Sequence, residues 1–389
     1  MAVAERDEAA SSTPRLQATV FATTFDRFAM PPLLMAMARD LGASLATVAA
    51  AAGAYFLVYG VLQPFWGLVT DRLGLARTIR WAVLGGTLAT GATALADDIA
   101  TLTAARVAAA VCFSAAFPST ITYVGEVVAV ASRQREISRL MTGVALGTAT
   151  GTVAAGMLAG TVGWRWAFVL SGLVGLVTTW LVWSLAELDP VRTTGRPWTP
   201  MVRVLRNRTA VVLLVLVALE GAGLLGAFTF VPAAVESTGP GPTVASAAAG
   251  AYGLAVLAGS LLVGRLAGRV AASRFIAVGG LLGAAGCALV AVTHAPAAAA
   301  VTCVLLGLCW AALHSSLQTW ATEVAPAERS TAVALFAGSL FAGTAAAAWV
   351  GGALAGLDRY ALLFGGCAVL CLLVGCFGSL ARGRWERAG

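Results

Sequence analysis

Long apolar stretches separated by short polar breaks run along nearly the whole chain of 389 residues. A transmembrane α-helix needs about 20 apolar residues to cross the hydrocarbon core of a bilayer, and these stretches have about that length. Arg, Gly, Pro or Asp residues mark the breaks. The pattern predicts twelve transmembrane helices, at residues 16–38, 44–66, 77–97, 99–123, 139–161, 165–186, 209–234, 245–267, 274–294, 297–322, 330–355 and 359–381.

The long polar break at residues 187–208 divides the predicted helices into two sets of six. We therefore expect a tail at 1–15, a six-helix bundle at 16–186, a linker at 187–208, a second six-helix bundle at 209–381 and a second tail at 382–389. The first apolar stretch is too long for the core of a cleavable signal peptide, so it is expected to stay in the membrane. The predicted fold class is an all-α membrane protein of two six-helix bundles.

The basic residues, all of them Arg, are distributed unevenly between the two sides of the predicted helices. Arg27 and Arg106 lie inside predicted spans, and only Arg39, Arg165 and Arg359 fall in loops on one side. The others lie on the side of the tails and the linker. Positively charged loops stay in the cytoplasm, so both tails and the linker are expected to be cytoplasmic, in a bacterial inner membrane.

The composition supports a membrane protein and argues against several other classes. Hydrophobic residues make up 59% of the chain and charged residues 11%, with a mean hydropathy of +0.86. Soluble domains carry roughly 25% charged residues. The net charge of +7 is spread over short loops and forms no basic face, which argues against nucleic-acid binding. The seven Cys residues lie in apolar stretches without a completing ligand set, so we expect no metal and no cofactor. The expected partners are the lipid bilayer, a small-molecule substrate and protons, with the protein a monomer.

The two halves of the sequence resemble each other at a fixed offset of 197 residues. Because both halves then have the same orientation, the repeat predicts a pseudo-twofold axis along the membrane normal, which is a transporter architecture. Chance similarity between two Ala/Gly/Leu-rich helices is a poor alternative, because several of the matching residues are polar. The matched pairs are Tyr55 and Tyr252, Gly67 and Gly264, Arg72 and Arg269, Arg77 and Arg274, and Glu126 and Glu323.

The loop between the second and third predicted spans, residues 67–77, reads GLVTDRLGLAR. It resembles the G-x-x-x-D-R-x-G-x-R-R loop of the major facilitator superfamily, and the similarity extends over essentially the whole chain. Gly67 allows close helix packing, Asp71 is placed to cap a helix, and Arg77 can pair with an acid such as Glu126. A tight turn that anchors topology is the simpler alternative. The resemblance implies a cytoplasmic gate, to which we assign Gly67, Asp71, Arg72, Gly74, Arg77, Glu126, Arg133 and Glu323.

The fifth predicted span carries glycines at every fourth position. Gly143, Gly147 and Gly151 form a stripe of small residues against which another helix can pack closely. The span is similar to the antiporter motif of the superfamily and ends in the sequence Gly-Trp-Arg at 163–165. Thr152 stands where the motif has Pro. The stripe therefore indicates helix packing more strongly than it indicates export.

Ionisable residues inside the spans are the main candidates for function, because each costs a few kcal/mol to insert. We assign proton coupling to Asp26 and Glu220, since a carboxyl group held away from water can exchange protons near neutral pH. Arg106 is similar to the Arg of the R-x-x-Q-G motif, which the resemblance links to proton coupling, and would tune a carboxylate. Static interhelical pairs are the alternative for each acid.

The resemblance implies that spans 1, 4, 7 and 10 line a central cavity. Neighbouring residues on a helix are rotated by about 100°, so Asp26 and Arg27 cannot both face it. Pro31 and Pro32 leave carbonyl groups near Phe28 without helical donors, which allows the first span to bend. Packing against neighbouring helices is the alternative for the aromatic residues, and an ordinary hydrogen bond is the alternative for His314. The candidate substrate contacts are Arg27, Met30, Tyr55, Tyr59, Phe117, Trp310, His314 and Gln318.

These features favour a proton-coupled exporter, an antiporter of a small amphipathic solute that works by alternating access. Proton-coupled uptake of a nutrient such as a sugar or an organic acid is the alternative, which the missing Pro of span 5 leaves open. A membrane enzyme or sensor is unsupported, because no nucleophile–base pair or metal cluster stands out in the sequence.

Overall fold

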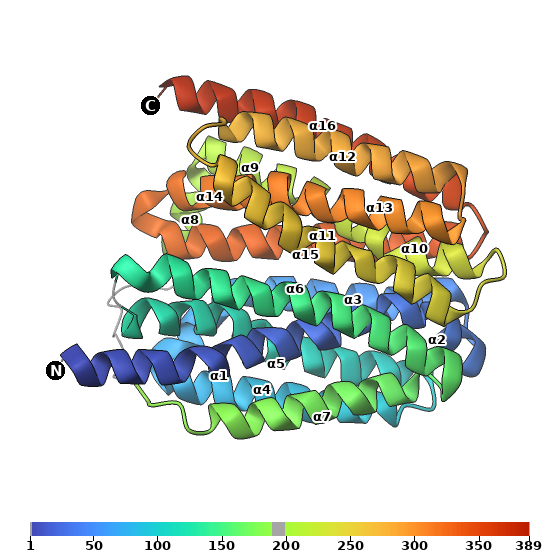
Figure 1. Cartoon of the computed structure of the whole chain (residues 1–389), viewed down its shortest axis with the longest axis horizontal. Coiled ribbons are helices and arrows are strands. Elements are labelled where there is room, and N and C mark those ends of the chain that lie inside the picture. The colour runs from blue at the N-terminus through green and yellow to red at the C-terminus, as the bar shows by residue number, and fades with distance from the viewer. Residues whose placement is uncertain (1, 129, 189–198, 389) are drawn as a thin grey trace.

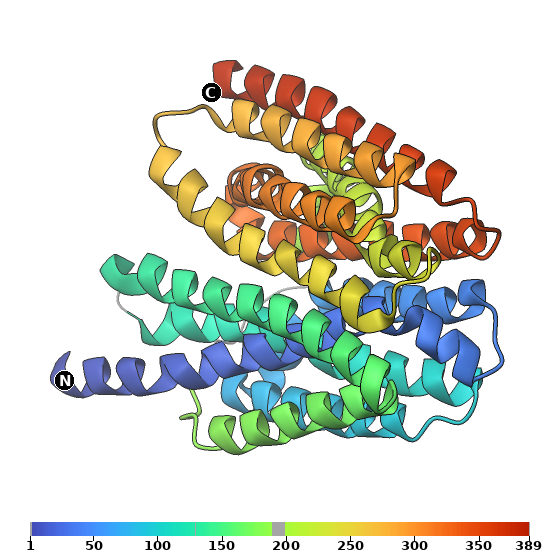
Figure 2. The same ribbon diagram turned by 45° about the vertical axis from the view of Figure 1, so that its right-hand side comes forward.

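The computed structural model describes residues 2–128, 130–188 and 199–388, and in these ranges the chain is almost entirely helical (Figure 1). The helices form two halves that lie side by side in both ribbon views (Figures 1 and 2). The first half contains α1 (Ala2–Ala29), η1 (Pro31–Leu33), α2 (Leu34–Asp40), α3 (Leu45–Leu73), α4 (Leu75–Ala94), α5 (Ile99–Val127), α6 (Val130–Thr161) and α7 (Arg165–Val182).

The second half begins inside the predicted linker, of which residues 189–198 lie outside the described ranges. It contains α8 (Thr199–Arg206), α9 (Arg208–Glu220), η2 (Gly221–Leu225), α10 (Gly226–Glu236), α11 (Pro242–Leu266), α12 (Ala272–Val292), α13 (Pro296–Cys309), η3 (Trp310–His314), α14 (Ser315–Glu323), η4 (Pro326–Glu328), α15 (Arg329–Ala355) and α16 (Tyr360–Ala388).

Ten helical segments of the described chain are long and apolar enough to span a membrane, and they coincide with ten of the predicted spans. The first predicted span corresponds to α1, η1 and α2, where Pro31 ends the regular α-helix, and the third corresponds to α4, which carries Arg77 and Arg80. Twelve spans therefore remain a prediction. The predicted tail at 1–15 is helical from Ala2 onward, in keeping with the high helix propensity of its Ala and Glu residues.

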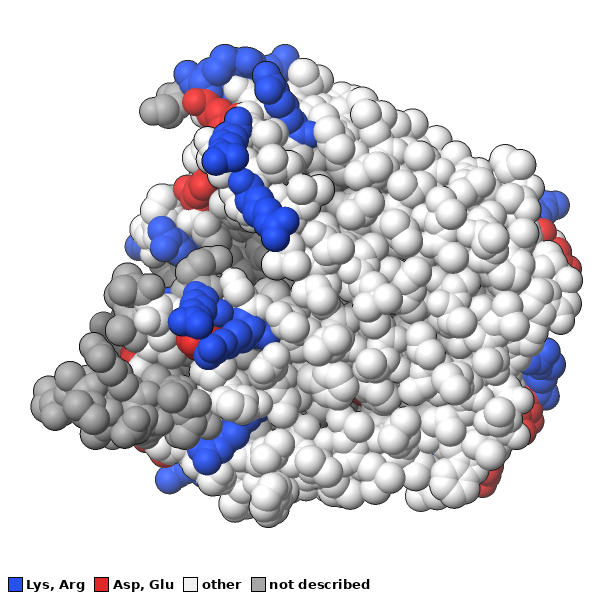
Figure 3. Space-filling model, in the orientation of Figure 1, with Lys and Arg blue, Asp and Glu red and all other residues white. Residues whose placement is uncertain are grey.

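On the face shown in Figure 3, charged side chains gather at two ends, with a wide uncharged band between them. Both chain termini lie at one of these ends, which we call the terminal end, and the other is the opposite end (Figure 1). An uncharged band that separates two charged rims is the surface expected of a protein embedded in a bilayer.

The helix contacts in one half are repeated in the other. In the first half α3 packs against α5, and α4 against α5 and α7; in the second, α11 packs against α13, and α12 against α13 and α16.

The predicted glycine stripe packs on α1: a Cβ on Gly147 would lie 2.6 Å from the Phe21 carbonyl oxygen, and one on Gly151 would lie 2.5 Å from that of Phe25. Thr152 Oγ1 donates to the Phe28 carbonyl at 3.1 Å, which Pro32 leaves without a helical donor. The residue that replaces the motif's Pro thus stabilises the break in the first span.

The two halves meet mainly toward the opposite end, through α3 with α15 and α6 with α11. Trp349 Nε1 donates to the Ala50 carbonyl at 3.2 Å, and a Cβ on Gly60 would lie 2.8 Å from the Gly338 carbonyl oxygen. At the terminal ends of α3 and α11, a Cβ on Gly67 or Gly264 would meet no atom within 4 Å. Helices α6 and α11 diverge in this direction (Figure 2). Gly67 is thus not at a close helix contact, contrary to the sequence expectation, because the halves part at this end.

Candidate transport site

Helix α1 directs Asp26 into the interior of the first half, where the residue is fully buried. Its Oδ1 atom accepts hydrogen bonds from Arg106 Nη1 at 3.0 Å, Thr90 Oγ1 at 2.8 Å and Ser171 Oγ at 3.2 Å. The Arg106 guanidinium group also lies 4.5 Å above the centre of the Tyr55 ring. Oδ2 of Asp26 has no hydrogen-bond partner within the described residues. The site therefore stabilises one carboxylate oxygen with three donors and leaves the other, which is also buried, without a partner among the described residues.

A second buried acid–base pair lies in the other half. Glu220 Oε1 is 3.0 Å from His314 Nδ1, and both side chains are almost completely buried. Glu220 precedes the π-helix η2 and His314 ends the π-helix η3. Such π-turns are rare and occur frequently at functional sites. The Trp310 ring stacks on the His314 ring, with centroids 3.7 Å apart.

The two pairs occupy equivalent helices of the repeat. In each half an acid on the first spanning segment faces a base on the fourth, Asp26 with Arg106 and Glu220 with His314. Arg106 is charged at all physiological pH values, whereas His can be neutral or protonated. The two halves thus use one architecture for pairs of different chemistry.

A cavity of about 60 Å³ lies between the two halves. This volume is much smaller than the roughly 300–1,000 Å³ of typical ligand pockets. A solute therefore requires the halves to move apart. The cavity wall consists of Arg27, Phe28, Pro31, Phe56, Val144 and Thr148 from the first half, and Leu225, Phe228, Thr229, Tyr252, Val256, Trp310 and Phe341 from the second.

Arg27 is the charged residue of this wall, and it points away from its neighbour Asp26. Its Nη2 donates to Tyr59 Oη at 2.6 Å, and its guanidinium group lies 4.3 Å above the Tyr59 ring and 5.1 Å above the Phe341 ring. The 100° separation on the helix predicts this divergence. Asp26 thus belongs to the interior pair, and the next residue of α1, Arg27, faces the cavity.

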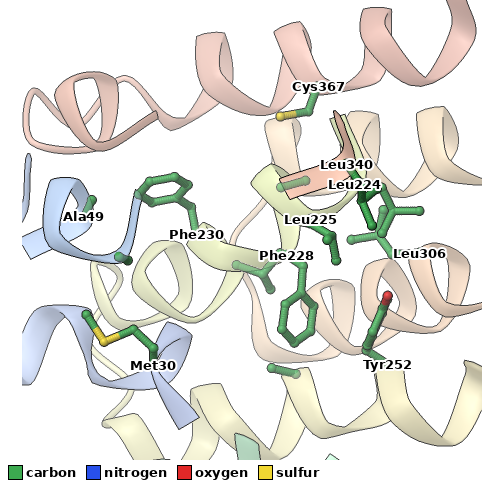
Figure 4. Packing of buried hydrophobic residues seen from close by; sticks show 14 of the residues in the cluster. Met30, Ala49, Leu224, Leu225, Phe228, Phe230, Tyr252, Leu306, Leu340 and Cys367 are labelled. Carbon is green, nitrogen blue, oxygen red and sulfur yellow. The ribbon is translucent and has the colours of Figure 1, made fainter. Parts of the chain in front are cut away.

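The remaining candidate contacts have different surroundings. Trp310 lines the cavity, whereas His314 binds Glu220 and Tyr55 faces Arg106. Met30 is buried in the apolar cluster shared by the halves (Figure 4), Phe117 packs against an apolar cluster within the first half, and Gln318 is half-buried on α14. Four aromatic residues of the wall were not expected from the sequence, namely Phe28, Phe228, Tyr252 and Phe341.

The loop between α3 and α4 is held by an acid that the sequence analysis did not select. Gly74 has φ of 90°, a conformation that favours glycine, and it separates the two helices. Glu187 accepts from the backbone N–H of Ala76 at 3.2 Å and of Arg77 at 2.9 Å, and Arg77 Nε lies 3.7 Å from the same carboxylate. Arg77 thus pairs with Glu187 and not with Glu126. Glu187 directly follows the sixth predicted span, which is the only sequence signal for it.

Asp71 belongs to the last turn of α3, and its side chain lies outside the described part of the structure. Glu187 caps the first turn of α4, which begins after Gly74. The other predicted gate residues do not form one cluster: Arg72 and Glu126 are exposed, Arg133 Nε donates to the Val128 carbonyl, and Glu323 pairs with Arg382 at 2.6 Å.

At the opposite end, Asp40 connects α2 to the start of α7. It accepts from Trp164 Nε1 at 3.0 Å and from the Arg165 guanidinium group. The hydrogen bond from Trp164, followed by that from Arg165, lowers the pKa of Asp40 below its ordinary value. Arg165 also donates to the Ala96 carbonyl at 2.9 Å, so this loop cluster fixes three helix ends together.

Two repeated helical halves around a central cavity, with buried acid–base pairs in an apolar interior, define a membrane transport protein. The family model for the Major Facilitator Superfamily matches residues 18–240 and 213–387, and the chain belongs to this superfamily. A relative in Bacillus subtilis (strain 168), the uncharacterized MFS-type transporter YtbD, is 27% identical over 263 residues. That match covers 65% of this chain and 64% of the relative, which is less than two thirds of the relative's length.

Solved structures share the fold at low sequence identity. The peptide transporter POT superposes with a TM-score of 0.80 at 14% identity and covers 99% of this chain and 98% of its own. The nucleoside transporter NupG gives 0.75 at 14% identity, covering 94% and 99%. A bacterial homologue of the human lysosomal transporter Spinster, in an inward-facing and unoccupied conformation, gives 0.73 at 16% identity, covering 98% of each chain.

Proposed function

We propose that this protein exports a small amphipathic solute in exchange for protons, by alternating access of the central cavity. The observation that carries the proposal is the adjacency of Asp26 and Arg27 on α1. Asp26 belongs to a buried acid–base pair, and Arg27 lines the cavity. A proton on one residue and a solute on the other would therefore act on the same turn of the helix, so that a movement of this turn affects both sites.

The break in α1 supplies the movable element. Met30 and Pro31 interrupt the helix one turn beyond Asp26, and Thr152 of α6 binds the carbonyl that the break leaves free. The break allows α1 to change its bend while the cavity faces one side or the other. In this mechanism both chain termini are cytoplasmic, so the cavity of the present structure is closed toward the outside, where α3 meets α15 and α6 meets α11.

An imposed pH gradient across proteoliposomes tests the proposal. Antiport drives the solute toward the acidic compartment, and symport drives it toward the alkaline one, whichever way the protein is inserted. The purified protein is reconstituted, a panel of labelled amphipathic compounds is screened by counterflow, and each hit is followed with the lumen made acidic or alkaline. Accumulation in the acidic compartment supports export. Accumulation in the alkaline compartment establishes uptake. Solute transport that does not respond to the pH gradient contradicts proton coupling.

Asp26→Asn is the variant for this assay, and Glu136→Gln is its control. Glu136 is an acid on the first half that pairs with Arg139 at 2.9 Å near the surface, away from the cavity wall. The control variant is expected to respond to the gradient as the wild type does.

A further inference from the structure

We infer that the transported solute is an amphipathic anion whose charged group binds Arg27. This inference rests on the proposed export function. Arg has five N–H donors, and Tyr59 accepts one of those of Arg27 at 2.6 Å. The Nε atom is buried and has no acceptor among the described residues. A buried guanidinium donor without an acceptor is costly. A solute that brings an acceptor into the cavity would remove this cost.

The charge of Arg27 is not neutralised by the acids nearest to it in the sequence and across the cavity. Asp26 is held by Arg106 in the interior of the first half. In the second half Glu220 is held by His314, which lies behind the ring of Trp310. Among the residues that the structure describes, none of those in the cavity wall is acidic. A solute with a carboxylate would supply both the missing acceptor and the missing negative charge.

The rest of the wall determines what else the solute contains. The rings of Phe28, Phe228 and Tyr252 form a compact triangle, with centroids 5.6 Å apart for Phe28 and Phe228, 4.6 Å for Phe228 and Tyr252, and 6.2 Å for Phe28 and Tyr252. Phe228 and Tyr252 lie side by side within the apolar cluster (Figure 4). Aromatic walls of this kind bind flat or branched apolar groups by burial and ring stacking. A carboxylate joined to an aromatic or branched apolar body fits both parts of the site.

Three probes with one ring system and different charges test the inference: 1-naphthoate, 1-naphthylmethylamine and 1-naphthylmethanol. Binding is measured by isothermal titration to the protein purified in an uncharged detergent, so that neither a proton gradient nor a lipid headgroup contributes. We expect the carboxylate to bind and to be favoured over the amine and the alcohol by about tenfold or more. Binding of the amine or the alcohol as tightly as the carboxylate, or no binding of the carboxylate at millimolar concentration, overturns the inference.

Variants of Arg27 then test whether this residue binds the carboxylate of the probe. Arg27→Gln is expected to lose about tenfold or more in affinity for 1-naphthoate, Arg27→Lys to lose less, and Arg206→Gln, at an exposed Arg outside the cavity wall, to lose nothing. Thermal melting of each variant excludes misfolding, and Arg27→Lys carries the test if Arg27→Gln is unstable. Unchanged affinity in both Arg27 variants overturns the site. Anion selectivity without any response of transport to a pH gradient would retain the inference and reject the proton-coupled function.

Discussion

Arg39 Nη2 lies 3.3 Å from Glu236 Oε2 and joins the two halves at the opposite end. These residues are 197 positions apart, which is also the offset of the sequence repeat. At this offset they hold equivalent sequence positions in the two halves. Glu236 is buried, whereas the side chain of Arg39 is 62% exposed, so this ion pair links the halves at the surface of the opposite end, beside the packing of α3 with α15 and of α6 with α11.

Glu236→Gln is expected to loosen this end, because the amide keeps the shape of the side chain but loses the charge that attracts Arg39. Opening should expose the backbone of the segments that meet here, at residues 45–53 of α3 and 349–356 of α15. Hydrogen exchange measured by mass spectrometry would then be faster in these two segments and unchanged elsewhere. The charge swap Arg39→Glu with Glu236→Arg should restore the wild-type rate. Exchange that stays slow in Glu236→Gln would show that helix packing alone closes this end.

The carboxylate of Glu187 stabilises the start of α4, so its removal should lower the stability of the first half. Two backbone N–H groups lose their acceptor in Glu187→Ala, and losing such a cap costs about 1 kcal/mol. Thermal melting of the purified protein measures the effect. Glu126→Ala, at an exposed acid close to the end of α5, is the matched control and should melt as the wild type does. Equal melting temperatures of the two variants would show that Glu187 is not the cap in solution.

Asp40 predicts a dependence of stability on pH. Its folded-state pKa is lowered by Trp164 and Arg165, so it stabilises the fold above its unfolded pKa, which is about 3.9. That contribution is lost as the pH falls through the still lower folded pKa. Asp40→Asn should therefore melt at a lower temperature than the wild type at pH 7, and the difference should shrink below pH 4. A difference that is constant from pH 7 to pH 3 would assign the effect to packing. Asp358→Asn, at an exposed loop position, controls for the loss of a negative charge.

Hydropathy and helix geometry were sufficient to predict most of the fold. The lengths of the apolar stretches located the helices, the stripe at Gly143, Gly147 and Gly151 located a close helix contact, and the 100° rotation separated Asp26 from Arg27. These features follow from local spacing. The break in the first span was also predictable, because Pro cannot continue the hydrogen bonds of a helix.

The contacts of the site could not be predicted in the same way. Glu187 binds the backbone of Arg77 from 110 residues away, and sequence spacing carries no information about such a pair. Phe228 and Tyr252 look like ordinary apolar residues of a span until helix packing brings them to the same cavity. The π-turns that orient Glu220 and His314 also depend on tertiary packing, since no proline or polar break marks either of them.

The two buried acids predict different outcomes for coupling. Asp26 is bound by Arg106, whose charge is permanent, so protonation of Asp26 would leave that charge unpaired in the interior. Such an imbalance is a strong drive for a conformational change. Glu220 is bound by His314, which can itself gain or lose a proton, so the pair can exchange a proton without a buried charge being left alone.

Asp26→Asn is therefore expected to lose transport driven by a pH gradient while retaining exchange of solute between equal concentrations. The amide oxygen still accepts from Thr90 and Ser171, but the group cannot carry a proton. Glu220→Gln is expected to weaken gradient-driven transport without abolishing it. Both rates are measured in proteoliposomes under an imposed gradient and in its absence, at matched protein content. If Asp26→Asn matches the wild type in both assays, Asp26 is a structural residue and the proton path lies at Glu220 and His314.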